Sequence, residues 1–585
     1  YEQPMPHDEM WDRLDALAEA QLILNTAAQG RDYRLDRFRH ALTPEVVRQS
    51  LPVARRRALH VRIADWLAGH SDSESDFATL AYHYDEGDVP DRAAHYALSA
   101  AERAQRLYAN TEALNLYAVA ARNLARLEAG ARWPLEMTLC LNRARIYFET
   151  GEYGGAEADI QRALELATEH ADRQRQAQAL NLMAELRYFQ VRFEEMAQAA
   201  EQAARIAEAE ALEPELTSAL RFVGYAYLHL GRRGDAPGPL KRALDLARAS
   251  GDRAAIAKTA VAMGTFYGEE YRLIDAMAMF EEALDLVRPS GDKLRTATYL
   301  YNLGEVLFRR GEADRAALVY AEAMGIFRAI EARVMLGYAL SGMGQVLCFA
   351  GQYSAARLHL DEATRLFEEI DDAFGAALCL SARGRDLERD LGEYAAARDH
   401  LLAALAALRP TSYVDETLYA LLALADVYLR LGEVDSAAST LDEASALIVR
   451  EQARWFTPEY ELTAGRLAMA REDFQSAIRC AHQALAAVSV RSDSRTLPAI
   501  SRLLASALFA ERQRDSSAVY DALERSVAAA RGRARRLDLA LSLDALGRYL
   551  KQHADRPTSQ ARGSGYLFEA DLIFREMGLK APPGG

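Results

Sequence analysis

The sequence predicts an all-α fold, an α-solenoid superhelix of helical hairpins, and three observations lead to this class. Small residues recur at a period of 40 residues along most of the chain, and a column of alanines recurs at the same period. After about residue 40, no run of alternating β-branched residues indicates a strand. A fixed period of this length is typical of a repeat array, whereas a non-repetitive helical bundle has none.

The segment from Thr298 to Glu331 shows the plan of one repeat. Gly304 lies in the first helix, Gly311 ends that helix, and Ala316 lies in the second helix. A small residue on the first helix lets the second helix approach closely, and apolar residues at i, i+3, i+4 and i+7 fill the space between them. The other predicted turn positions are Gly151, Val191, Gly231, Tyr271, Gly351, Gly392, Gly432, Glu472 and Gln513.

Two further columns accompany the turns. The small residues before the turns are Ala144, Ala184, Gly224, Gly264, Gly344, Gly384, Ala425, Gly465 and Ser506. The alanines after the turns are Ala156, Ala236, Ala276, Ala356, Ala397, Ala437, Ala477 and Ala518, with Met196 as the one exception in that column. The repeat around Gly384 slips by one residue, because its turn at Gly392 comes one position late.

These residues resemble tetratricopeptide repeats. The pairs Leu303-Gly304 with Ala316 and Met343-Gly344 with Ala356 carry the resemblance, which covers the chain from about Arg132 to Met577. The usual period of that family is about 34 residues, and the longer unit here resembles the repeats of bacterial regulators. The resemblance implies a superhelix of about eleven or twelve hairpins, in which the first helices line a concave groove.

The composition excludes several classes of function. The net charge of −15 argues against nucleic acid as the main partner, because a nucleic-acid-binding chain needs a basic face. No apolar run approaches the roughly 18 residues of a membrane span, and no signal peptide is seen. The four cysteines (Cys140, Cys348, Cys379 and Cys480) have neither CxxC nor metal-ligand spacing, which favours reduced thiols in a cytoplasmic protein.

No pattern for catalysis is present. The 12 histidines are scattered, no HExxH occurs, and no GxxxxGK[ST] phosphate-binding loop is found. We therefore expect no catalytic residue, no metal site and no enzymatic activity in this chain.

The N-terminal segment has the outline of a partial winged-helix domain over residues 1–70. An amphipathic helix at 10–24 precedes two short strands around Gly30 and Asp32, and helices follow at about 44–50 and 53–69. The pieces RFRHAL and RRRALH, in this order, resemble the junction between ATPase and sensor in bacterial signal-transduction ATPases with numerous domains. The maltose-regulon activator type and many LuxR-like regulators share that plan.

This second resemblance covers about residues 10–130 and implies a sensor attached to a nucleotide switch. In that family ADP lies between the ATPase core and the winged helix, and the position that matches the phosphate-contacting histidine is His40; a structural histidine at a strand end is the alternative. We therefore expect no cofactor in this chain, and ADP or ATP only in a longer parent protein with an upstream ATPase domain. The start at Tyr1 suggests a fragment, and an oligomer on activation is a further expectation.

The remaining chain divides into three parts. Residues 71–130 are expected to form irregular capping helices, with a loop at Ala129 to Pro134 as the boundary. Residues 131–555 form the repeat array. Residues 556–585 follow as the rest of a polar insertion, HADRPTSQARGSG, a closing helix and a disordered tail.

The inward positions of the first helices are the candidate ligand site. Polar and aromatic residues recur close to the small residue, where they would face the groove and bind a peptide, a protein or a small effector. The alternative is that helices facing water carry polar residues in any case. The candidate residues are Asn181, Glu185, Tyr188, Arg221, Tyr225, His229, Tyr301, Glu305, Ser341 and Gln345.

We expect the chain to be the sensor or scaffold region of a signal-transduction ATPase or transcriptional regulator, gating a nucleotide-dependent switch. The alternative is a stand-alone tetratricopeptide scaffold for protein–protein interaction, without a switch.

Overall fold

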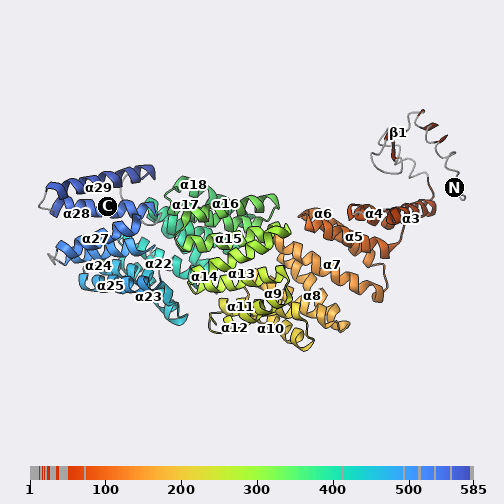
Figure 1. Ribbon diagram of the computed structural model, residues 1–585, viewed down its shortest axis with the longest axis horizontal. Coiled ribbons are helices and arrows are strands. Elements are labelled where there is room, and N and C mark those ends of the chain that lie inside the picture. The colour runs from red at the N-terminus through yellow and green to blue at the C-terminus, as the bar shows by residue number, and fades with distance from the viewer. Residues whose placement is uncertain are drawn as a thin grey trace. The chain divides into compact units, whose positions relative to one another are not determined.

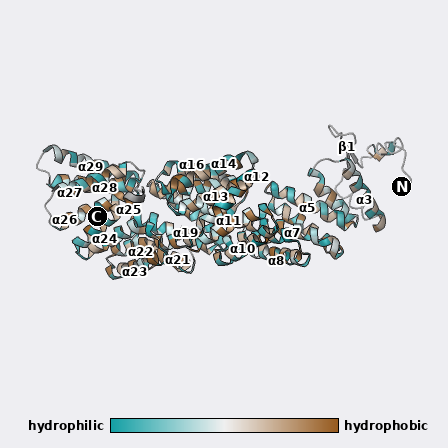
Figure 2. Ribbon diagram, turned by 60° about the horizontal axis from the view of Figure 1, so that its bottom comes forward, coloured by the Kyte–Doolittle hydropathy of each residue, from teal (hydrophilic) through white to brown (hydrophobic). Residues whose placement is uncertain are grey.

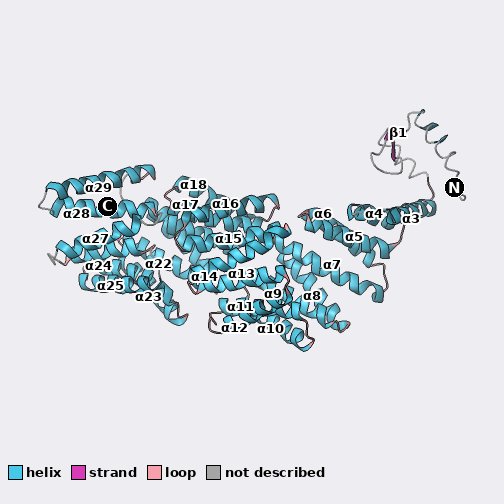
Figure 3. Ribbon diagram, viewed as in Figure 1, coloured by secondary structure: helices cyan, strands magenta, loops and turns pink. Residues whose placement is uncertain are grey.

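A computed structural model describes residues 51–70, 74–411, 413–491, 495–511, 516–531, 535–553 and 557–579, with short pieces before residue 39. The chain divides into two compact units, Tyr1–Arg143 and Ala144–Gly585. Helices make up nearly all of the described residues (Figure 3). The predicted all-α solenoid is confirmed.

The first unit begins with a short antiparallel strand pair. Strand β1 (Ile23–Thr26) pairs with β2 (Leu35–Phe38), and Ile23 lies opposite Phe38. The predicted strand pair and the helix at 53–69 are both confirmed. The helices of this unit are α3 (Val53–His70), α4 (Phe77–Glu86), α5 (Pro90–Arg106), α6 (Asn110–Leu124) and the first part of α7 (Ala129–Thr150). Three predictions fall outside the described residues: the turn at Gly30 and Asp32, the candidate residue His40, and the helix at 44–50.

The second unit is a series of hairpins, each with a first (A) helix and a second (B) helix (Figure 1). The A helices are α9 (Arg173–Phe189), α11 (Glu213–His229), α13 (Arg253–Glu269), α15 (Lys293–Arg309), α17 (Arg333–Phe349), α19 (Ala373–Ala382) with α20 (Arg389–Leu391), α22 (Val414–Leu431), α24 (Thr457–Ala470), α26 (Leu497–Ala510) and α28 (Arg536–His553). The B helices are α8 (Tyr153–Glu169), α10 (Phe193–Ala209), α12 (Pro237–Ser250), α14 (Leu273–Val287), α16 (Ala313–Ala329), α18 (Tyr353–Glu369), α21 (Tyr394–Leu408), α23 (Val434–Arg450), α25 (Phe474–Arg491), α27 (Ser516–Arg531) and α29 (Pro557–Glu576). Hydrophilic and hydrophobic residues are mixed along the helices of the array (Figure 2).

The turns between A and B helices lie where the sequence predicts them. Gly311 has a φ of 82°, and the same left-handed conformation occurs at the non-glycine turns Val191, Tyr271 and Glu472. This conformation lets the chain leave one helix and enter the next. The predicted turn at Gln513 lies outside the described residues.

The small-residue column is confirmed as the site of closest helix approach. A Cβ atom added at Gly304 would lie 2.8 Å from the ring of Tyr320 in the partner B helix. The corresponding distances are 2.8 Å from Gly264 to Phe280 and 2.7 Å from Gly344 to Leu360. The alanine column faces the same gap and is fully buried from Ala156 to Ala477, with Met196 equally buried, whereas Ala518 is only half-buried.

The one-residue slip has a structural cause in the A helix after α17. Residues Arg383–Glu388 form a π-helix between α19 and α20. A π-helix inserts one residue into a helix without breaking it. The extra residue is therefore absorbed within the helix, and Gly384 still approaches Leu401 of the partner B helix at a Cβ distance of 2.6 Å.

A periodic set of ion pairs links successive B helices. Arg248 binds Glu282, and the same 34-residue step joins three further arginine–glutamate pairs. These pairs are about half exposed, so each contributes up to about 1 kcal/mol. The further pairs are Arg288–Glu322, Arg328–Glu362 and Arg409–Glu443.

The array also contacts itself between repeats that are far apart in the sequence. The hydroxyl groups of Tyr271 and Tyr419 lie 3.0 Å apart although 148 residues separate them. Arg535 donates to Asp390 at 3.2 Å, across 145 residues. We call these cross-turn contacts, because they join successive turns of the superhelix.

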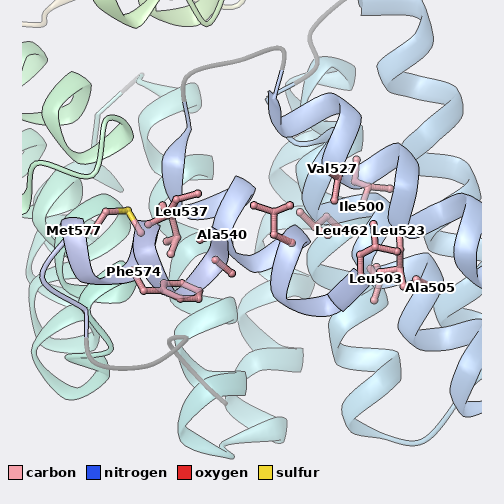
Figure 4. Close-up of a cluster of buried hydrophobic side chains, with 14 of the residues drawn as sticks. Leu462, Ile500, Leu503, Ala505, Leu523, Val527, Leu537, Ala540, Phe574 and Met577 are labelled. Carbon is pink, nitrogen blue, oxygen red and sulfur yellow. The ribbon is translucent and has the colours of Figure 1, made fainter. Parts of the chain in front are cut away.

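The C-terminal hairpins share one apolar core with residues of α17, α18 and α19, and part of this core is shown in Figure 4. Phe574 and Met577 at the end of α29 belong to the same core as Leu537 and Ala540 of α28. The Met577 side chain also lies against the turn at Gly351. The last hairpin thus closes on the α17–α18 hairpin.

Two expectations about connections are wrong. The loop expected at Ala129 to Pro134 is instead the beginning of α7, which continues through Pro134. The expected polar insertion after residue 552 is, from Pro557 onward, the first half of α29. Its glycines serve close packing, since a Cβ at Gly563 would lie 2.9 Å from the carbonyl oxygen of Gly547.

Candidate functional site

The ten candidate residues all lie on A helices of the second unit. They come from α9, α11, α15 and α17, and we call this set the A-helix face. Each helix presents them one turn apart, so that the side chains of neighbouring A helices meet. The contacts divide the set into residues whose polar atoms are already bonded and residues whose polar atoms are free.

Four of the ten residues serve the fold. Asn181 donates from its amide to the backbone carbonyl of Glu215 at 3.0 Å. Glu305 accepts from the hydroxyl of Tyr320 at 2.6 Å. The remaining two are Gln345, which accepts from Arg385 at 2.8 Å, and Ser341, which is buried.

The aromatic part of the A-helix face is packed against a segment from a distant repeat. His229 stacks on Phe193 with ring centroids 4.4 Å apart, and Tyr413 lies 5.7 Å from both rings. Tyr188 lies 5.8 Å from Tyr225 and 5.7 Å from His229. The sequence groups Tyr188, Tyr225 and His229 correctly, but Tyr413 shows no periodic relation to them.

Burial sets the protonation of this cluster. It raises the pKa of the hydroxyl groups of Tyr188 and Tyr225 above the usual value. Burial also lowers the pKa of His229 to about 4, which the carboxylate of Glu269 opposes. His229 is therefore neutral at pH 7, and its buried Nε2 atom has no hydrogen-bond partner.

Three residues of the A-helix face keep polar groups available. Glu185, Arg221 and Tyr301 are half-buried, and none forms an ion pair or a side-chain hydrogen bond within the described part of the chain. The guanidinium of Arg221 lies over the ring of Phe222, 3.9 Å from its centroid. These three side chains can bind a ligand without breaking a bond of the fold.

A charged cluster at the start of α22 was not predicted from the sequence. Asp415 accepts from the indole of Trp455 at 3.3 Å and lies 3.9 Å from Arg233 and 4.0 Å from Arg309. Burial and the neighbouring Glu269 raise the pKa of Asp415 to about 7, against the effect of the two arginines. No local pattern marks Asp415, because Trp455 comes from the next hairpin and Arg233 and Arg309 come from much earlier repeats.

Two surface pockets lie elsewhere. In the first unit a pocket of about 580 Å³ contains Asp65, Tyr84 and Arg92, and Arg92 donates to Asp65 at 2.6 Å. In the second unit a pocket of about 510 Å³ is rich in arginine, including Arg531 and Arg535. The arginines of this second pocket are each paired with a carboxylate.

No catalytic arrangement stands out in the described ranges. His60 and His83 approach to 2.9 Å between their Nδ1 atoms, which makes them a structural pair at the α3–α4 contact. Burial raises the pKa of the thiols of Cys348 and Cys379, which keeps them protonated. No group of three or more histidine, cysteine or acidic side chains among the described residues is arranged to hold a metal ion. None of the described helices is long and apolar enough to cross a membrane.

Residues 257–560, slightly more than half of the chain, match the family model described as MalT-like TPR region. No curated protein matches the chain. Among solved structures, a Rap protein complexed with competence and sporulation factor is 14% identical, covering 62% of this chain and 99% of its own, with a TM-score of 0.46. The Rap conjugation gene regulator of plasmid pLS20, in complex with the Phr* peptide, is 14% identical, covering 62% and 96%, with a TM-score of 0.43. The APC/C hetero-tetramer Cut9-Hcn1 is 16% identical, covering 90% and 98%, with a TM-score of 0.41.

Proposed function

This chain belongs to the family of MalT-like TPR regions, and we propose that it is a sensor array that binds a protein, a peptide or a small effector on its A-helix face. In a longer parent protein, a signal-transduction ATPase or transcriptional regulator of the cytoplasm, the array gates a nucleotide-dependent switch. His40 then contacts the phosphate of ADP held by an upstream ATPase domain, and activation assembles an oligomer.

One observation carries the binding half of the proposal. Glu185, Arg221 and Tyr301 are half-buried, and none of them has an ion pair or a side-chain hydrogen bond among the described residues. Half-buried polar groups without partners lose hydration and gain nothing in return, so a ligand that satisfies them binds favourably. A face that served only the fold would pair these groups internally, as it pairs Asn181 and Glu305.

The cross-turn contacts support the gating half. Tyr413 at the start of α22 packs on His229 and Phe193, which belong to repeats much earlier in the chain. A ligand on the A-helix face that changes the distance between superhelical turns changes these contacts as well. Gating then needs two states of the array with different ligand affinity.

Binding is tested by screening peptides and metabolites for a thermal shift of this chain. We expect Arg221→Ala and Tyr301→Ala to abolish the shift for a hit, whereas Arg328→Ala, in the ladder between B helices, leaves it unchanged. A hit that binds both A-helix-face variants as well as the wild type refutes the site.

The gating part of the proposal is tested separately, on the gene and on the parent protein. Residues encoded upstream of Tyr1 must contain a Walker A motif, and hydrolysis of ATP by the parent protein must change when the hit is added. A gene without that motif favours the alternative, a tetratricopeptide scaffold that binds proteins and has no switch.

A further inference from the structure

Basic side chains follow a diagonal across the A helices of the second unit. Arg221 of α11, Lys258 of α13 and Arg295 of α15 lie at successively earlier positions of their helices, while Arg145 of α7 and Glu185 of α9 each directly follow the small residue of their own helix, Ala144 and Ala184. Such a shift of about one helical turn per helix brings side chains of neighbouring tilted helices together. In the structure α11 packs against both α9 and α13, and α13 packs against α15. The charges of Arg295, Arg221, Glu185 and Arg145 all act on the pKa of Lys258.

The ammonium group of Lys258 is the centre of this cluster. Lys258 is half-buried, and within the described residues it has neither a hydrogen bond nor an ion pair. Arg295 is held by Asp292 at the start of α15, while Arg221 rests on Phe222 and Arg145 is exposed. Among the four charged groups that act most strongly on Lys258, three are arginines and one, Glu185, is a carboxylate, so positive charge exceeds negative charge in this group.

This excess contrasts with the rest of the protein. The chain carries a net charge of −15, and many arginines of the array have carboxylate partners, including the arginines of the 510 Å³ pocket. Arg187, equally close to the A-helix face, is bound by both Glu157 and Glu195. A partly buried group of cations that carboxylates neutralise only in part is costly unless an anion completes the neutralisation.

We propose that Arg221, Lys258 and Arg145 form a binding site for an anionic oxygen group, a carboxylate or a phosphate, of the ligand. The site rests on the proposed function, since it lies on the same face and names the chemistry of the ligand. The guanidinium of Arg221 offers a planar fork for two oxygens, the ammonium of Lys258 adds a point charge, and Arg295 contributes its charge from beside Asp292. The exposed Arg145 attracts the anion from solution.

The protonation of Lys258 provides a signature of binding. Burial and the charges of Arg295 and Arg221 lower the pKa of Lys258 to about 8. Near pH 8, Lys258 is therefore about half protonated in the free protein. A bound anion raises this pKa, so that binding takes up to about 0.5 proton from the solution at pH 8. At pH 6 the lysine is already charged, and no proton is taken up there.

The experiment is calorimetric titration of the full chain with inorganic phosphate and with succinate. Each titration is run at constant ionic strength, at pH 6 and pH 8, in two buffers that differ in ionisation enthalpy. We expect one of the two anions to bind with proton uptake at pH 8 and without uptake at pH 6. Preference for phosphate identifies a phosphoryl group on the ligand, and preference for succinate identifies a carboxylate.

Two substitutions of Lys258 distinguish the contribution of its positive charge to anion affinity from the proton uptake that accompanies binding. Lys258→Met should weaken binding roughly tenfold, with a fold confirmed by circular dichroism. Lys258→Arg should keep most of the affinity but lose the proton uptake, because the guanidinium stays charged at pH 8. The control is Lys241→Met on the exposed side of α12, which should change neither quantity.

Two outcomes overturn the site. The first is that neither anion binds the wild type at millimolar concentration, and the second is that Lys258→Met binds as well as Lys241→Met does. Both outcomes are distinct from failure of the proposed function. A neutral ligand whose binding depends on Tyr301 and not on Lys258 would refute the anion site and leave the sensor array in place.

Discussion

The substitution of Gly304 by alanine tests the helix contact on which the whole array depends. The ring of Tyr320 is fully buried between two glycines, because a Cβ at Gly304 would lie 2.8 Å from it and a Cβ at Gly342 would lie 2.7 Å from it. Its hydroxyl donates to Glu305 at 2.6 Å. The ring therefore has no free direction in which to move away from a new methyl group.

The expected magnitude follows from two opposing terms. Replacing a helical glycine by alanine stabilises a helix by up to about 1 kcal/mol. Overpacking a fully buried contact costs about 1–3 kcal/mol. Gly304→Ala should therefore lower the free energy of unfolding by up to about 2 kcal/mol. Gly325→Ala provides the matched control in the same hairpin, because a Cβ there meets nothing within 4 Å, and this variant should gain about 0.5–1 kcal/mol.

The assay is urea unfolding followed by circular dichroism, with hydrogen exchange of α15 and α16 as the local measurement. Exchange is needed because repeat arrays do not always unfold in one step. Adding Tyr320→Ala should remove the penalty of Gly304→Ala, since the ring that clashes is then absent. Equal stabilisation by Gly304→Ala and Gly325→Ala would refute the close approach of the two helices.

Three further predictions concern the groups around the A-helix face. The pKa of His229 is lowered to about 4 from 6.5 by burial, so the unfolded chain binds more protons and the wild type loses roughly 1–3 kcal/mol of stability as the pH falls from about 6.5 to 4. His229→Phe should lose less over that range in urea unfolding, and equal pH dependence would contradict the burial of the imidazole. Tyr271→Phe and Tyr419→Phe should show a coupling energy of about 0.5–1 kcal/mol in a double-mutant cycle, whereas additive effects would mean that the cross-turn contact is not made in solution. Arg187→Ala should lower the free energy of unfolding by about 2 kcal/mol, because it removes a buried side chain bound to two carboxylates. Arg328→Ala, in the exposed ion pairs between B helices, should lower it by less than about 1 kcal/mol. Similar losses of stability for the two variants in thermal unfolding would contradict this ranking.

The repeat plan was predictable because its causes are local. A small residue, a turn and an alanine at fixed spacing determine how one hairpin packs, and Gly304, Gly311 and Ala316 take the predicted roles. The slip near Gly384 was visible as one additional residue, but spacing alone does not distinguish a longer turn from the π-helix that is found. The segment HADRPTSQARGSG was predicted as a polar insertion, but from Pro557 onward it belongs to a helix, in which Gly563 packs directly on Gly547.

The candidate site was predictable only in part. Position along an A helix shows which residues can face inward, and it places Tyr188, Tyr225 and His229 together as observed. Whether a polar atom is free depends on neighbours that the period does not specify, as the bond from Tyr320 to Glu305 shows. Lys258 was missed because only positions within five residues of the small residue were considered.

Contacts between turns of the superhelix depend on geometry that no single repeat encodes. The small rotation at each interface accumulates over several hairpins before Tyr419 reaches Tyr271 or Tyr413 reaches His229. A sequence pattern with a period of one repeat does not specify the total rotation accumulated over several hairpins. The charged cluster at Asp415 could not be predicted from the sequence for the same reason.

The contact of Tyr271 with Tyr419 makes the number of hairpins a fixed property of the molecule. Deleting one hairpin from the 148 residues between them would preserve every type of neighbouring interface and yet bring the wrong residue opposite Tyr271. A solenoid without contacts between its turns can gain or lose repeats freely. In this array, duplication or loss of a repeat would break the contacts between turns, so substitutions within the repeats are tolerated much more easily. Engineered arrays derived from it should therefore be shortened or extended by complete superhelical turns.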